Sequence, residues 1–254
     1  MSNRNDAVER AIKLLRDAGH AVALTGAGLS TESGIPDFRS PGGVWENFRP
    51  VEYAEFIASH EARKEHWRYK RATVPTMLAA EPNAAHNALA QLEAAGRLQA
   101  VITQNIDALH QRAGSRRVLE LHGTNLEAVC LRCGARSPIQ EALATLDAGM
   151  EVPTCARCGG WLKPATVSFG QALPADVLGE ATEMAQRSDV LLALGSSLLV
   201  TPAASLAGLA KQCGGALIII NLTETPYDRL ADVVLHEKVG AVLAAITAAV
   251  VRPE

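Results

Sequence analysis

Four cysteines have the most specific chemical spacing in this chain. Cys130 and Cys133 form one C-x-x-C pair, Cys155 and Cys158 form a second, and 21 residues lie between the pairs. Two such turns can arrange four thiolates tetrahedrally around one Zn²⁺ ion. Because protein ligands would fill all four positions, the predicted zinc is structural. The weaker alternative is two unrelated redox or buried cysteine pairs.

A glycine-rich loop follows the first apolar run, residues 21–25. Gly26 and Gly28 could bring backbone N–H groups close to a pyrophosphate. The dinucleotide fingerprint G-x-G-x-x-G has a third glycine where this chain has Thr31, and an acidic residue about twenty positions later. Glu46 lies at that distance, but in a segment with no predicted strand. The ordinary dehydrogenase interpretation therefore fails.

Polar side chains also follow two later apolar runs. Gln104, Asn105 and Asp107 come directly after one of them, and their groups suit an amide and ribose hydroxyls. A helix cap is the alternative for this stretch. His122 follows the other run, and an imidazole can accept a proton near neutral pH. A structural histidine is the alternative there.

Small residues end two further predicted strands. Gly195, Ser196 and Ser197 follow one strand, and Asn221 follows the next. Such residues can hold the ribose and adenine half of a dinucleotide. Taken alone, each stretch is only a turn.

Short apolar runs alternate with amphipathic segments along most of the chain. This alternation predicts an α/β fold with a doubly wound parallel sheet. The predicted strands are residues 21–25, 100–103, 190–194, 216–220 and 233–235, and the predicted helices are 6–18, 84–95, 175–186, 202–212 and 240–250.

Two stretches interrupt the alternation and are predicted inserts. Residues 41–82 indicate a helical module, and residues 124–164 indicate a zinc ribbon, held together by metal rather than by an apolar core. Residues 1–40, 83–123 and 165–254 then make up one doubly wound α/β domain.

Bulk composition excludes several classes of function. The chain has 254 residues, 48% of them hydrophobic, and a net charge of −3, which argues against direct nucleic-acid binding. The start of the chain has no signal pattern, and the longest uncharged apolar stretch, residues 239–251, is too short to span a membrane. We expect a cytoplasmic protein without membrane contact. We also expect a monomer, with Cys213 as a small core residue.

The combined motifs resemble those of the sirtuin family, the NAD-dependent protein-lysine deacylases. They are GAGLSTESGIPDFR, TQNIDALH, LHG, the paired C-x-x-C, KPATVSFG, GSSLLVTPAA and INLTETP, in family order from Leu24 to about Leu235. The resemblance implies that residues 1–40, 83–123 and 165–254 form a large Rossmann-like NAD-binding domain. The two inserts would form a smaller domain. The resemblance also implies NAD and one structural zinc ion, with acyl-lysine proteins or peptides as partners. The products would be nicotinamide, O-acyl-ADP-ribose and free lysine.

The resemblance also assigns roles to individual residues. His122, the general base, and Asn105 would be catalytic. Val167, Phe169 and Gly170 would bind the substrate backbone. The residues expected to contact NAD are Gly26, Ala27, Gly28, Ser30, Thr31, Phe38, Arg39, Gln104, Asn105, Ile106, Asp107, His122, Gly195, Ser196, Ser197, Asn221 and Leu222.

The stretch HWRYKR, residues 66–71, bears on the acyl group. Relatives that remove acidic acyl groups such as succinyl carry a tyrosine and, three residues later, an arginine. Trp67 and Lys70 occupy these positions here, and lysine lacks the planar fork that grips a carboxylate. We therefore expect acetyl or other uncharged acyl groups. Alternatively, Lys70 and Arg71 form a solvated helix face.

Three alternative functions remain open at this point. One is a preference for succinyl or long-chain acyl groups. Another is mono-ADP-ribosyltransfer, which uses the same departure of nicotinamide. The third is a non-catalytic NAD or zinc module that serves as a scaffold.

Overall fold

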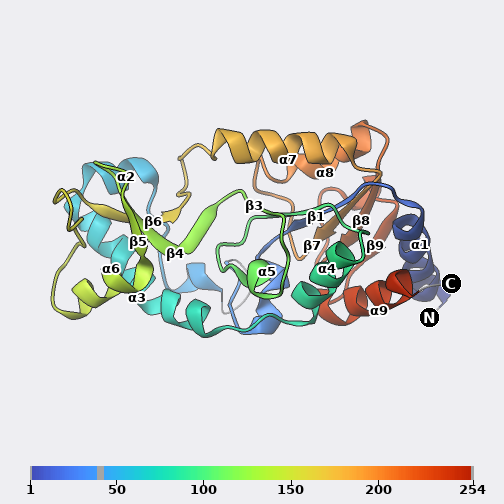
Figure 1. Ribbon diagram of the computed structural model, residues 1–254, viewed down its shortest axis with the longest axis horizontal. Coiled ribbons are helices and arrows are strands. Elements are labelled where there is room, and N and C mark those ends of the chain that lie inside the picture. Colours follow the sequence, from blue (N-terminus) through green and yellow to red (C-terminus); the bar gives the residue numbers. More distant parts are fainter. Residues whose placement is uncertain (1, 39–42, 253–254) are drawn as a thin grey trace.

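The computed structural model describes residues 2–38 and 43–252. It has a large α/β region and a smaller region at the opposite end of the molecule, and both chain ends lie in the large region (Figure 1). Most of the loops that carry predicted site residues lie between these two regions, or at the edge of the large sheet that faces the smaller region.

A six-stranded parallel sheet forms the centre of the large region. Its order is β3 (Val118–Glu120), β2 (Ala100–Thr103), β1 (Ala21–Thr25), β7 (Val190–Leu194), β8 (Ala216–Ile220), β9 (Val233–Leu235). The five predicted strands are confirmed at the predicted bounds, and β3 is an additional short edge strand. The chain proceeds outward from β1 in both directions, so the strand order reverses between β1 and β7.

Helices cover both faces of this sheet, which explains why its strands are apolar throughout. The helices α7 (Ala175–Arg187) and α8 (Ser205–Gln212) pack on one face. The helices α1 (Ser2–Asp17), α4 (Ala84–Ala94) and α9 (Val239–Val251) pack on the other. In β1, Val22 and Leu24 point into the apolar core beneath α7 and α8, and Ala21 and Ala23 point into the core beneath α1, α4 and α9. The α/β fold with a doubly wound sheet is therefore confirmed.

Helix bounds agree with the predicted ones except at two starts, and α1 begins at Ser2 rather than at the predicted residue 6. The predicted helix over residues 202–212 begins only at Ser205, because residues 201–204 form a turn. The apolar C-terminal helix α9 is largely buried and packs against α4 and α1. None of the described helices combines the length and apolar character needed to cross a bilayer. Cys213 is exposed at the end of α8, so its predicted place in the core is wrong.

The small region combines both inserts. The first supplies α2 (Tyr53–Ala58) and α3 (His60–Ala79). The second supplies α6 (Ile139–Asp147) and an antiparallel sheet ordered β5 (Arg136–Pro138), β4 (Gly123–Cys130), β6 (Leu162–Thr166). The helix α6 was not predicted.

The two inserts share a third apolar core. Phe56 and Trp67 from the first insert pack with Ile139, Leu146 and Leu162 from the second. The expectation that metal alone holds the zinc insert is therefore wrong. Ile139, Ala142 and Leu146 of α6 do recur at helical spacing, so this helix has a local signal that the prediction overlooked. The predicted domain boundaries at 123/124 and 164/165 fall inside β4 and β6, and the division into domains stays a prediction.

Candidate active site and metal centre

Five predicted site segments meet at the carboxyl edge of the large sheet. Gly26 follows β1, Gln104 follows β2, His122 follows β3, Gly195 follows β7 and Asn221 follows β8. In an open α/β sheet, ligands bind at this edge, where the strand order reverses. The fold therefore brings together residues that are up to two hundred positions apart in the sequence.

Asn105 and Asp107 join the loop after β2 to the glycine-rich loop after β1. The Asn105 amide Nδ2 donates to the carbonyl oxygen of Gly26 at 3.1 Å and to Ser30 Oγ at 3.0 Å. The Ser30 hydroxyl in turn donates to Asp107 Oδ2 at 2.7 Å. Asp107 Oδ1 also accepts the N–H of Leu109, although Ala108 and not Asp107 occupies the N-cap position that the helix-cap alternative expected. The same carboxylate thus orders the loop and the start of α5 (Leu109–Arg112).

The glycines of the first loop allow a close crossing of two backbones. The N–H of Gly28 donates to the carbonyl oxygen of Gly195 at 2.9 Å. A Cβ on Gly28 would lie 2.9 Å from that oxygen, and one on Gly195 would lie 2.2 Å from Leu29 N. Gly195 also has φ +58, which favours glycine. Protein packing alone therefore requires these glycines, and their contact with phosphates stays a prediction.

His122 is arranged as a neutral proton acceptor. Its Nδ1 lies 3.0 Å from the carbonyl oxygen of Gln104, which can only accept, so Nδ1 carries the proton. The lone pair is then on Nε2, which bonds to none of the described residues. Burial lowers the pKa of His122 below its ordinary 6.5, and the Gln104 carbonyl only partly opposes this shift. The imidazole is therefore neutral at pH 7.

The predicted substrate segment lies directly beside His122. The N–H of Val167 donates to the carbonyl oxygen of His122 at 2.8 Å, and the carbonyl oxygen of Phe169 accepts the N–H of Tyr53 at 2.9 Å. The Phe169 side chain is 46% exposed. Residues 167–170 thus connect the base to the small region.

The remaining predicted NAD contacts line the same edge. Ser196 Oγ accepts Gln104 Nε2 at 3.1 Å, and the Asn221 amide donates to the carbonyl oxygen of Thr223 at 2.8 Å. Leu222 is 63% exposed. Four further residues, partly or fully accessible, are Ala27, Thr31, Ile106 and Ser197, and Phe38 is half-buried. Arg39 lies outside the described residues.

Trp67 and Lys70 are both buried, so the solvated-face alternative is wrong for Lys70. The Trp67 indole has no exposed surface and donates to the carbonyl oxygen of Leu162 at 3.2 Å. The Lys70 ammonium donates to Asn125 Oδ1 at 2.9 Å, and burial lowers its pKa from 10.5 to about 7. Arg71 is exposed and pairs with Asp147, as a solvated face would. Direct acyl contact by Trp67 and Lys70 stays a prediction.

Asn125 and Lys163 also contact site segments, although neither has a role predicted from the sequence. The N–H of Asn125 donates to the carbonyl oxygen of Ile106 at 2.9 Å, which ties the small region to the NAD-site segment. The buried Lys163 ammonium donates to the carbonyl oxygens of Pro164 and Thr166, just before the substrate segment. Nothing local marks Asn125, whose partners Ile106 and Lys70 lie in other segments, whereas Lys163 begins the KPATVSFG motif and donates to near neighbours in the chain.

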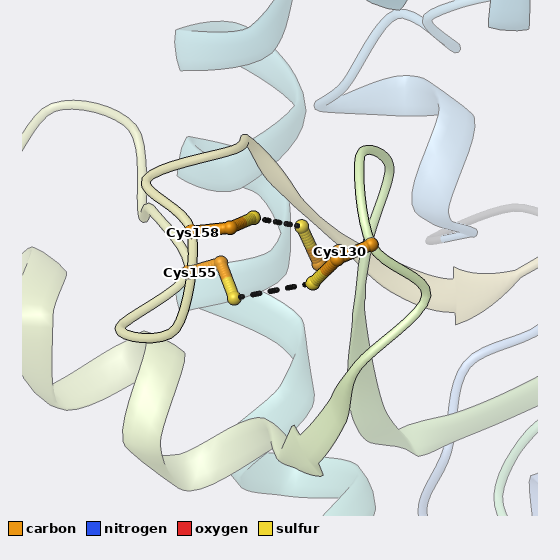
Figure 2. A group of neighbouring side chains, drawn as sticks. Cys130, Cys155 and Cys158 are labelled. Carbon is orange, nitrogen blue, oxygen red and sulfur yellow. Dashed lines mark hydrogen bonds between the residues drawn. The ribbon is translucent and has the colours of Figure 1, made fainter.

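The four cysteines form a compact cluster on two facing loops (Figure 2). The Cys130 and Cys158 sulfurs are 3.4 Å apart, the Cys133 and Cys155 sulfurs are 3.8 Å apart, and all four lie within 4.8 Å of one another. Disulfide sulfurs would be about 2 Å apart. Tetrahedral ligands at zinc's usual Zn–S distance would be about 3.8 Å apart. The cluster therefore fits one structural zinc ion.

The chemistry of one thiol also suits a metal. The N–H of Cys133 donates to the Cys130 sulfur and lowers its pKa to about 6. Zinc binds the thiolate form that this interaction favours. The predicted metal ligands thus meet as expected, although they are far apart in the sequence.

Comparison with known proteins agrees with this arrangement. The sequence model of the Sir2 family matches residues 26–202. An NAD-dependent protein deacetylase of Thermodesulfovibrio yellowstonii is 44% identical over 239 residues, 94% of this chain and 93% of that protein. NAD-dependent protein deacetylase 2 of Streptomyces coelicolor is 48% identical over 229 residues, 88% of this chain and 94% of that protein.

Solved structures agree as well. A Sir2 structure with a deacetylated p53 peptide and 3'-O-acetyl-ADP-ribose has a TM-score of 0.89 and 41% identity, covering 94% of this chain and 96% of that one. A Sir2 structure bound to a propionylated peptide has a TM-score of 0.86 and 40% identity, covering 94% and 97%. The fold, the site and these matches agree, and this chain belongs to the Sir2 (sirtuin) family.

Proposed function

We propose that this chain is an NAD-dependent protein-lysine deacetylase. One observation carries the proposal: a neutral imidazole, His122, holds an unprotonated Nε2 at the carboxyl edge of the sheet, beside Gln104 and Asn105. The relatives named as NAD-dependent protein deacetylases match this chain over nearly its whole length.

The polar groups at this edge fit NAD. The side-chain oxygens of Gln104, Asn105 and Asp107 offer acceptors for a carboxamide and ribose hydroxyls, while the amide N–H groups of Gln104 and Asn105 already bond to the protein. Ser196, Ser197, Asn221 and Leu222 would hold the adenosine half. When bound, NAD supplies a glycosidic bond that breaks to release nicotinamide and a ribose that receives the acyl group.

His122 then acts as the general base. Its Nε2 accepts a proton from a ribose hydroxyl, and the Gln104 carbonyl keeps Nδ1–H in place as the imidazole becomes charged. This help is worth about 10²–10⁴-fold in rate for a positioned base. Asn105 orients the reacting groups from a fixed position, since its Nδ2 already bonds to Gly26 and Ser30.

The acyl-lysine peptide would bind along residues 167–170, next to the base. We propose that uncharged acyl groups are preferred. The Trp67 N–H already donates to Leu162, and the buried Lys70 ammonium lacks the planar fork that grips a carboxylate and has its pKa lowered to about 7, so the pair is poorly matched to an acyl carboxylate. Solved relatives carry acetylated and propionylated peptides.

A peptide panel with the His122→Ala variant tests this function. The wild type, given NAD, should deacetylate an acetyl-lysine peptide and act much more slowly on a succinyl-lysine peptide, measured by mass spectrometry of peptide and nicotinamide. His122→Ala should lose at least about a hundredfold in deacetylation because only the base is removed. It should keep its fold and its NAD binding.

His60→Ala is the matched control, because His60 is exposed on the small region and 52% of its side chain is accessible. It should retain wild-type turnover. Near wild-type deacetylation by His122→Ala would overturn the proposed mechanism. Rapid desuccinylation would overturn the acyl preference alone, and ADP-ribosylated protein without deacetylation would favour the transferase alternative.

A further inference from the structure

Two histidines lie buried beneath the candidate active site and have no role in the function proposed above. His86, near the start of α4, has no exposed surface, and His110, in α5, is 1% exposed. Their ring centroids are 4.9 Å apart. Neither His86 Nε2 nor His110 Nδ1 has a hydrogen-bond partner among the described residues. Buried polar atoms are nearly always paired, so this pair needs an explanation.

The hydrogen bonds of His86 determine where its proton lies. The backbone N–H of Asn83 donates to His86 Nδ1 at 3.2 Å, so Nδ1 carries no proton. Burial lowers the pKa of His86, and the ring is neutral at pH 7. The single ring proton is therefore on Nε2, and this unpaired atom is a donor.

The hydrogen bonds of His110 determine the opposite arrangement. The Thr25 hydroxyl donates to Thr103 Oγ1 at 2.8 Å, and Thr103 Oγ1 also accepts the N–H of Asn105 at 3.0 Å. Thr25 has no second proton, so His110 Nε2, 2.9 Å away, must donate to it. His110 is also neutral because burial lowers its pKa, and its Nδ1 is a bare acceptor. Reversed hydroxyls would put the His110 proton on Nδ1, so the two unpaired atoms of the histidine pair would both be donors, with no acceptor among the described residues between them.

We propose that one buried water accepts from His86 Nε2–H and donates to His110 Nδ1, and that His110 is thereby a positioning residue for Asn105. One unpaired atom is a donor and the other is an acceptor. Their pairing through this water completes one continuous chain of hydrogen bonds, which runs from Asn83 through the two histidines, Thr25 and Thr103 to Asn105. The role toward Asn105 rests on the proposed function, whereas the hydrogen-bond chain itself does not.

Both ends of this chain hold the glycine-rich loop. Asn83 Nδ2 donates to the carbonyl oxygen of Leu29 at 2.8 Å and to Ser33 Oγ at 3.0 Å. At the other end, Asn105 Nδ2 donates to Ser30 Oγ at 3.0 Å. The hydrogen-bond chain and the loop therefore form a closed ring of contacts. This ring fixes the orientation of the Asn105 amide and of the loop relative to each other.

Nuclear magnetic resonance of the full-length wild type tests the chain without any substitution. In long-range ¹H–¹⁵N spectra of protein labelled at histidine, His86 and His110 should both be neutral Nε2–H tautomers at pH 7. His122 should be the Nδ1–H tautomer and serves as the internal comparison. An Nδ1–H tautomer or a charged ring at either buried histidine would overturn the proposal.

Kinetics of four variants test the positioning role. His86→Leu and His110→Leu should each lower kcat/KM for NAD by about tenfold to a hundredfold, with KM for the acetyl peptide within about twofold of wild type. The double variant should be no worse than the worse single variant, because both break one chain. His110→Gln should recover part of the loss, since its amide can donate to Thr25.

Three results would overturn the positioning role. They are additive losses in the double variant, a matching rise in KM for the acetyl peptide, and a His110→Gln variant as impaired as His110→Leu. Zinc content and far-ultraviolet circular dichroism check that each variant is folded. If the wild type itself fails to deacetylate, the proposed function fails, and the tautomers still decide whether the chain exists.

Discussion

At the residue scale, burial sets the charge of the most informative side chains. His122 is neutral because it is largely withdrawn from water, and its carbonyl partner selects which nitrogen can accept a proton. Lys70 follows the same rule with a different consequence. It is 3% exposed, and among the described residues no carboxylate pairs with it.

We predict that Lys70→Met changes how stability depends on pH. The pKa of Lys70 is about 7 in the folded chain and ordinarily 10.5. Between these values the unfolded chain binds a proton that the folded chain lacks, so the free energy of unfolding rises with pH. Below about pH 7 both states are charged, and the full cost of burial is present. Urea titrations from pH 7 to 10 should show the wild type gaining on the order of a few kcal/mol relative to the variant.

The pH slope is the diagnostic quantity in this experiment, because Lys70→Met also leaves Asn125 Oδ1 without its donor. Arg71→Met is the matched control. Arg71 is exposed beside Asp147, and such a surface pair contributes only about 0–1 kcal/mol. Parallel pH profiles for the wild type and Lys70→Met would contradict a buried, titrating amine.

At the element scale, the close pairing of β4 with β6 positions both His122 and the substrate segment. Gly123 opens β4 with φ +68, and a Cβ there would lie 2.1 Å from the carbonyl oxygen of Ala165. Only glycine allows the two strands to approach this closely. The paired strands therefore link the small region directly to the carboxyl edge of the large sheet, where His122 lies.

We predict that Gly123→Ala is more destabilising than an alanine at an open left-handed glycine. Gly96 is the matched control, since its φ is +71 and nothing lies within 4 Å of an added Cβ. Gly96→Ala should cost about 1–2 kcal/mol from backbone strain alone. Gly123→Ala adds a collision between backbones and should cost more, and turnover should fall because His122 is adjacent. Equal losses in denaturant titrations would show that β4 and β6 separate freely.

At the scale of the whole molecule, three separate apolar cores stabilise the fold. Two lie on the faces of the large sheet, and the third joins the two inserts around Trp67. Cys130 and Cys155 belong to this third core as well as to the metal cluster. Metal and apolar packing therefore stabilise the small region together.

We predict one zinc ion per chain and a selective effect of its loss. Cys155→Ser should lower the zinc content, lower the thermal midpoint and abolish deacetylation, because the small region loosens around the substrate segment. Most far-ultraviolet circular dichroism should persist, since the sheet cores contain none of the ligands. Cys213→Ser, which alters an exposed cysteine outside the cluster, is the control and should keep its zinc. A stable, active and metal-free wild type would contradict the assignment.

Much of the fold could be predicted from the sequence because its signals are local. A strand such as β8, with three successive isoleucines, is buried on both faces and needs no distant residue to be recognised. The C-x-x-C pairs are equally local. The helix α6 could have been predicted from the helical spacing of Ile139, Ala142 and Leu146, whereas the third core could not, because it joins residues of two inserts that are separate in the sequence.

The sequence by itself determined the residue types at the site, their order and the family to which they belong. Only the tertiary structure decided their physical states. The neutral tautomer of His122 depends on a carbonyl eighteen residues away, and the buried amine of Lys70 depends on Asn125 in another insert. Proton positions and pKa values follow from partners and from burial, and both exist only after distant segments have packed together.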